Sequence, residues 1–101
     1  MADFVRVAAK ADIPEGEGMT FEVDGTEVAV FNVEGTFFAI DNTCKHQGGP
    51  LGEGALDGCV VTCPWHDWTY DVTTGQSPED PDCSVARYQV KVEGDDVFVA
   101  L

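Results

Sequence analysis

The sequence predicts an all-β domain, and three observations support this fold class. Short runs rich in Val, Phe, Thr and Ile recur towards both ends of the chain, turn signals separate them at short intervals, and no window carries a convincing helical stripe. With 101 residues and 44% hydrophobic content, the chain has material for one domain with a modest core. We therefore predict a β sandwich or a small open barrel.

Tight turns join most of the expected strands, which are residues 4–8, 20–23, 26–33, 36–40, 88–92 and 97–101. Asp24-Gly25 and Glu34-Gly35 each separate two neighbouring runs, and glycine supplies the positive φ that such hairpin turns need. Residues 11–16 indicate a turn or a single helical turn, and residues 93–96 indicate a turn into the last strand. Apolar and polar residues alternate over 87–92, which predicts one apolar and one wet face there.

The middle of the chain departs from this pattern. Between residues 41 and 81 glycines and prolines are frequent and long apolar alternations are few. Such a segment needs cross-links to hold one shape, because its backbone gains little from regular pairing. We expect it to be an insertion that is ordered by a bound group.

That segment contains both histidines of the chain, each beside a cysteine. Cys44-Lys45-His46 and Cys63-Pro64-Trp65-His66 together read C-x-H-x16-C-x2-H. A Rieske [2Fe-2S] cluster needs two Cys on one iron and two His on the other, which favours this cofactor. A structural zinc site can use the same four ligands, but zinc fingers usually pair Cys with Cys and His with His within a loop.

The other two cysteines do not indicate a disulfide framework. The N-terminus lacks a signal-peptide layout and no apolar run reaches the roughly 20 residues of a membrane span, so we expect a cytoplasmic protein without membrane contact. Cys59 stands in residues 59–62, an apolar strand-like run, and is expected to be a buried, inert thiol. Cys83 follows a loop and is expected to be a spare thiol.

The chain is strongly acidic. Nineteen Asp and Glu residues against five Lys and Arg residues give a formal net charge of -14. This charge excludes nucleic acid and anionic membranes as natural partners. It suits either attraction to basic protein surfaces or solubility in a salt-rich cytosol, and the sequence does not decide between the two.

Around the ligands the chain resembles the Rieske ferredoxins that serve bacterial ring-hydroxylating oxygenases. The matching stretches are 44–51 and 63–75, with Pro78 and Pro81 beyond them, and the whole length fits the single domain of that family. The resemblance implies a Rieske-type antiparallel β sandwich, with a base domain of about 1–40 and 82–101 and an inserted cluster-binding subdomain of about 41–81. It also implies one [2Fe-2S] cluster per chain, with Cys44 and Cys63 on the inner iron and His46 and His66 on the outer iron.

The same resemblance implies electron transfer without catalysis. We expect a monomeric one-electron carrier between a ferredoxin reductase, flavin-dependent in such systems, and a terminal oxygenase. A cluster-bearing small subunit of a nitrite-reductase-like complex is the alternative.

We expect the potential to lie low in the Rieske window of about -150 to +300 mV. Gly49 and Trp65 stand where respiratory relatives have a disulfide, and Trp68 stands where those relatives have a serine donor. Tyr70 matches a tyrosine that donates to a ligating sulfur and raises the potential slightly.

Overall fold

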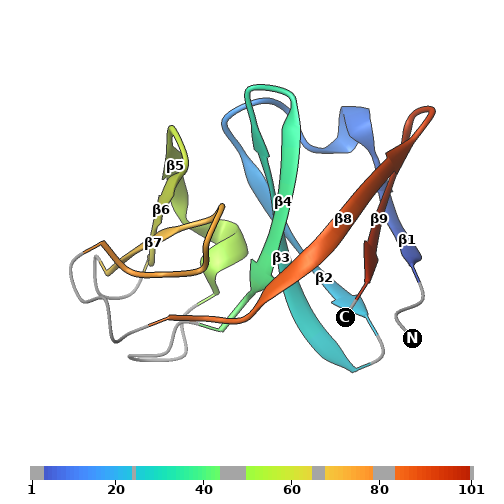
Figure 1. Cartoon of the computed structure of the whole chain (residues 1–101). Coiled ribbons are helices and arrows are strands. Elements are labelled where there is room, and N and C mark those ends of the chain that lie inside the picture. Colours follow the sequence, from blue (N-terminus) through green and yellow to red (C-terminus); the bar gives the residue numbers. More distant parts are fainter. Residues whose placement is uncertain (1–3, 24, 44–49, 65–67, 79–83, 101) are drawn as a thin grey trace.

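The computed structural model describes residues 4–23, 25–43, 50–64, 68–78 and 84–100. These residues form two antiparallel sheets, one of six strands in the order β1-β9-β8-β4-β3-β2 and one of three in the order β5-β6-β7 (Figure 1). The strands are β1 Val5–Ala9, β2 Gly18–Val23, β3 Thr26–Val33, β4 Thr36–Asp41, β5 Ala55–Asp57, β6 Val60–Thr62, β7 Thr69–Asp71, β8 Arg87–Glu93 and β9 Asp96–Ala100. Two short 3-10 helices, η1 Lys10–Asp12 and η2 Leu51–Glu53, complete the elements.

The predicted hairpins of the large sheet are confirmed. Val23 pairs with Thr26 across a two-residue turn between β2 and β3, and Gly25 in that turn has φ +83°. Val33 pairs with Thr36 between β3 and β4 in the same way. Where a turn or a single helical turn is expected over residues 11–16, the structure has the single 3-10 turn η1 at Lys10–Asp12. Local turn chemistry therefore sets the register of these strands.

The large sheet curls until its two edge strands, β1 and β2, contact each other. Its concave side encloses one hydrophobic core, made of Ala8, Ile13, Val23, Val28, Val30, Phe37, Ala39, Val97 and Val99. This arrangement confirms the all-β prediction. The apolar face expected along β8 is only partly buried, since Tyr88 and Val90 pack on the core while Val92 remains 40% exposed.

The small sheet lies beside the large one and comes entirely from the middle of the chain (Figure 1). Its three strands have three residues each, which is too short for an alternating pattern to be read in the sequence. A second core joins the two sheets, because Ala29, Phe31 and Ile40 of the large sheet pack with buried residues of the middle segment. Within the described residues no helix is long and apolar enough to cross a membrane.

Candidate metal centre

The first predicted ligand loop leaves β4 and returns at η2. Cys44 and His46 lie outside the described residues, but both ends of their loop are placed. Thr43 and Pro50 form an antiparallel bridge, and the Leu51 amide N donates to the Asn42 carbonyl O at 2.7 Å. The loop is therefore closed at its base by backbone pairing.

Asn42 adds a second connection at this base through its side chain. Its Oδ1 accepts hydrogen bonds from the Gly52 amide at 2.8 Å and from the Thr20 hydroxyl at 2.9 Å. The side chain is nearly fully buried, with 3% of the residue exposed. A buried amide with two bonds to different elements fixes η2 against β2 and β4.

The second predicted ligand loop is the connection between β6 and β7. Thr62 pairs with Thr69, and the Cys63 amide N donates to the Trp68 carbonyl O at 2.6 Å. Cys63 directly follows β6 and is fully buried. His66 falls within this loop and outside the described residues.

A third loop begins after Gln76 and contains Pro78 and Pro81, the two prolines that take part in the family resemblance. Gln76 and Ser84 form an antiparallel bridge, and the Val85 amide N donates to the Gly75 carbonyl O at 2.7 Å. Gly75 has φ +81°, and a Cβ there would lie 2.4 Å from the Val85 carbonyl O. Only glycine satisfies both conditions at the base of this loop.

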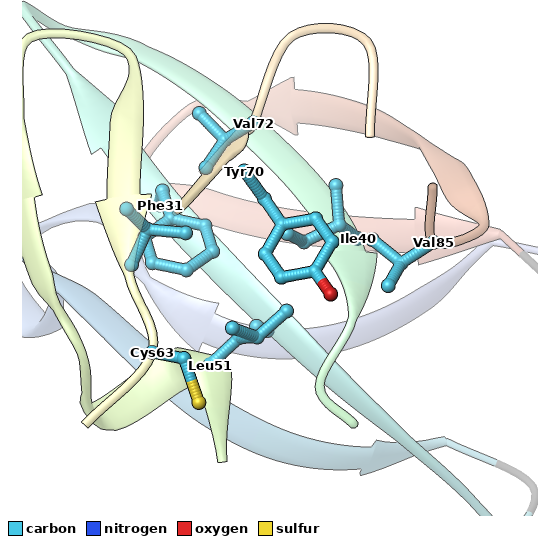
Figure 2. Close-up of a cluster of buried hydrophobic side chains, with 9 residues drawn as sticks. Phe31, Ile40, Leu51, Cys63, Tyr70, Val72 and Val85 are labelled. Carbon is cyan, nitrogen blue, oxygen red and sulfur yellow. The ribbon is translucent and has the colours of Figure 1, made fainter. Parts of the chain in front are cut away.

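One hydrophobic core connects the bases of all three loops. Leu51 ends the first loop, Cys63 and Tyr70 flank the second, and Val85 follows the third; all four belong to the same buried cluster. Figure 2 shows these side chains with Phe31 and Ile40, and the Cys63 sulfur lies at the edge of the group, on the side of Leu51. Packing therefore holds the three loop bases in a fixed relation.

The structure separates Cys59 from this arrangement. Cys59 precedes β6 while Cys63 follows it, and the Cys59 carbonyl O accepts a hydrogen bond from the Val72 amide. Four residues of extended chain span about 13 Å, whereas zinc–sulfur bonds are about 2.3 Å long. Cys59 therefore does not add a thiol to a zinc site at Cys63. It is also half-buried and not the buried thiol that we predicted.

The described residues fit an iron–sulfur group at these loops. Cys63 provides a fully buried sulfur next to the second loop, and thiolate sulfur is the ligand that such clusters require. Among the described residues, no group of three or more His, Cys, Asp and Glu side chains forms a metal site of its own. Cys63 is the one predicted ligand that the described structure places; Cys44, His46 and His66 stay predictions.

Sequence reasoning missed three residues of this region. Asn42 and Leu51 close the first loop, and Ser77 is fully buried on the third. An asparagine directly after a strand is a signal for Asn42, whereas nothing in the sequence distinguishes a buried Ser77 from an exposed serine.

Comparison with known proteins agrees with this geometry. The family model of the Rieske [2Fe-2S] domain matches residues 3–99. The ferredoxin component of a naphthalene 1,2-dioxygenase system from Pseudomonas aeruginosa is 35% identical over 97% of this chain and 95% of its own length. The ferredoxin component of biphenyl 2,3-dioxygenase from Rhodococcus jostii is 39% identical over 95% and 91%.

Solved structures show the same fold. A complex of oxygenase and ferredoxin in carbazole 1,9a-dioxygenase contains a match with a TM-score of 0.87 and 33% identity, covering 96% of this chain and 92% of that one. A protein from Mycobacterium tuberculosis, named for an NADH-dependent nitrite reductase small subunit, has a TM-score of 0.92 at 23% identity, covering 100% and 96%, and shows the fold alone.

These findings define an iron–sulfur protein of the all-β Rieske class. The chain belongs to the Rieske [2Fe-2S] domain family. Its cofactor is accordingly a Rieske-type [2Fe-2S] cluster.

Proposed function

We propose that this chain carries single electrons from a reductase, flavin-dependent by resemblance, to a terminal oxygenase. Two observations outside the chain support the proposal: the relatives above are named ferredoxin components of dioxygenase systems, and one matched structure is a complex with its oxygenase. Within the chain, the observation that carries it is a buried Cys63 in a core that joins three loop bases. A site of this kind holds a redox group rigidly at the end of a small domain.

We assign the ligands as the sequence predicts them, with Cys44 and Cys63 on the inner iron and His46 and His66 on the outer iron. When bound, the cluster supplies a reversible one-electron step. The chain's own residues bind and orient it, and the two imidazoles keep a second ring nitrogen for a partner protein or water. All four ligand positions are filled by the protein, which leaves no open position for substrate and fits a carrier that is not an enzyme.

The same proposal divides the chain into two parts. Residues of about 41–81 form the cluster-binding subdomain, and about 1–40 and 82–101 form the base. The distribution of strands supports this, since β5, β6 and β7 all lie in the first range and the six strands of the large sheet lie essentially in the second. We further propose that the protein acts as a monomer in the cytoplasm.

The neighbours of the ligands favour a potential at the low end of the Rieske window. Trp68 stands where a serine would donate a hydrogen bond to the cluster, and an indole has no hydroxyl to replace it. Tyr70 is buried in the core between the loops and remains the predicted donor to a ligating sulfur. A midpoint potential clearly positive of the hydrogen electrode would contradict this part of the proposal.

Electron paramagnetic resonance of the reduced protein tests the cofactor and the ligands. We expect the low average g value of mixed His and Cys ligation, and we expect Cys63→Ser to abolish or strongly alter that spectrum. Cys59→Ser is the matched control, because it changes the thiol at the other end of β6 and should leave the spectrum intact. An unchanged spectrum in His46→Ala or His66→Ala would refute the ligand assignment.

Single-turnover electron transfer tests the role. The reduced protein should re-oxidise rapidly when it is mixed with a Rieske-type ring-hydroxylating oxygenase and should accept electrons from a flavin reductase. The second role is the alternative that the sequence leaves open, a cluster-bearing small subunit of a nitrite-reductase-like complex. Co-elution with a large reductase during gel filtration of native extract, without transfer to an oxygenase, would favour the second role.

A further inference from the structure

Ser77 carries a hydroxyl that the protein buries without a partner. The residue is 0% exposed, and its Oγ makes no hydrogen bond to the described part of the chain. A hydroxyl removed from water without a replacement bond is destabilising, so such atoms in native proteins usually indicate a missing partner. The position of Ser77 in the fold therefore indicates which group its hydroxyl could bond.

Backbone pairing shows where Ser77 lies. The Gly75 amide donates to the Asp71 carbonyl at 2.7 Å, and the Asp71 amide donates to the Gln76 carbonyl at 2.8 Å. The chain therefore turns back at Gly75 and returns alongside β7 (Figure 1). Because Asp71 pairs with Gln76, the next residue, Ser77, is in register with Tyr70.

That position shares a face with the predicted inner ligand. Residues opposite each other on antiparallel strands point to the same side, and so do residues two apart on one strand. Tyr70 pairs with Val61, and Cys63 follows Val61 by two residues. Tyr70, Cys63 and Ser77 are all fully buried, which agrees with one inward face on the side of the ligand loops.

We propose that the Ser77 hydroxyl donates a hydrogen bond to a sulfur atom of the cluster, an inference that rests on the function proposed above. Sulfur becomes more negative when the cluster is reduced and then accepts a hydrogen bond more strongly, so the donor stabilises the reduced form. Ser77 would thus supply, from the third loop, a hydroxyl that Trp68 cannot supply from the second.

Redox titration of the cluster-loaded protein tests this proposal. Ser77→Ala should weaken reduction by roughly fivefold, the size of one modest hydrogen bond, which at about 59 mV per tenfold lowers the midpoint potential by about 40 mV. Ser77→Cys keeps the side-chain shape but donates weakly, and it should lower the potential less. Ser84→Ala is the matched control, because Ser84 is exposed and is the other serine of the chain.

A second measurement follows the proton itself. Pulsed electron paramagnetic resonance in H2O and D2O should detect the exchangeable proton couplings of the cluster. One of the couplings of the parent protein should be absent in Ser77→Ala and retained in Ser84→Ala. An intact Rieske spectrum with unchanged potential and unchanged couplings in Ser77→Ala would overturn the inference and leave the proposed carrier function standing. Absence of a Rieske spectrum from the parent protein would overturn the function itself.

Discussion

Replacing Asn42 with alanine should loosen the first ligand loop more than it unfolds the domain. The side chain of Asn42 accepts hydrogen bonds from Gly52 and Thr20, while its backbone carbonyl accepts one from Leu51. Alanine keeps the backbone bond and removes the two side-chain bonds. The link between η2, β2 and the end of β4 is thereby lost.

The expected loss of stability follows from the two bonds. The Gly52 amide is buried and is left without an acceptor, which costs about 1–3 kcal/mol. The Thr20 hydroxyl is only partly buried and can turn to water, so its lost bond costs about 1 kcal/mol. Together, Asn42→Ala should lower the free energy of unfolding by about 2–4 kcal/mol.

Asn32→Ala is a control of the same chemistry at the other end of β3 and β4. Asn32 is likewise buried and also makes two side-chain hydrogen bonds, to the Ile13 carbonyl at 2.7 Å and from the Gly35 amide at 2.8 Å. Denaturant unfolding should give similar losses for both variants. Loss of visible cluster absorbance in the presence of an iron chelator should be faster only in Asn42→Ala.

Equal rates of cluster loss in the two variants would refute this reasoning. Such a result would mean that global stability, and not closure of the first loop, controls retention of the cluster.

Three further predictions concern stability. Gly75→Ala should lower the free energy of unfolding by at least about 1–2 kcal/mol, which is the cost of the positive φ. The loss should be larger still because the new Cβ would collide with the Val85 carbonyl O. Gly58→Ala, with φ +63° and nothing within 4 Å of a Cβ, should show only the first cost in denaturant unfolding. Burial, and then the charge of Asp41, raise the pKa of Tyr88 above 10.0. The protonated Tyr88 therefore stabilises the fold below pH 10, and this stabilisation is lost as the pH rises further. Tyr88→Phe should flatten the dependence of the free energy of unfolding on pH above 10. With a net charge of -14, the unfolding midpoint should rise between about 0.1 and 1 M NaCl as the screening length falls from about 10 to 3 Å, and a fall would contradict the charge argument.

The large sheet could be predicted from the sequence because its turns are local. Asp24-Gly25 and Glu34-Gly35 each specify a two-residue hairpin, and the strands between them are long enough to show their apolar content. The ligand motif also stands out in the sequence, since the spacing of Cys and His is itself a chemical requirement, and its four-residue assignment stays a prediction. Both features depend on residues that are close in sequence.

The small sheet and the loop bases could not be predicted in the same way. The apolar run 59–62 indicates β6, but strands of three residues carry no alternating pattern. They form because Val61 and Tyr70 reach a core shared with Phe31 and Ile40 from distant strands. The burial of Ser77 has the same origin, since it depends on a return of the chain at Gly75. Tertiary contacts decide these elements, and local propensity does not.

The basic residues help to explain how the acidity of the chain is distributed. Arg6 pairs with Asp96 at 2.9 Å, Lys91 lies over the rings of Phe4 and Phe98, and the Arg87 side chain donates to a backbone carbonyl. Arg6 and Lys91 thus offset negative charge on β1, β8 and β9, whereas the Arg87 guanidinium reaches the Thr73 carbonyl O in the turn after β7, beside the small sheet. With nineteen Asp and Glu residues against five Lys and Arg residues, these contacts leave most of the negative charge of the chain unbalanced, so a partner that charge attracts should present basic residues.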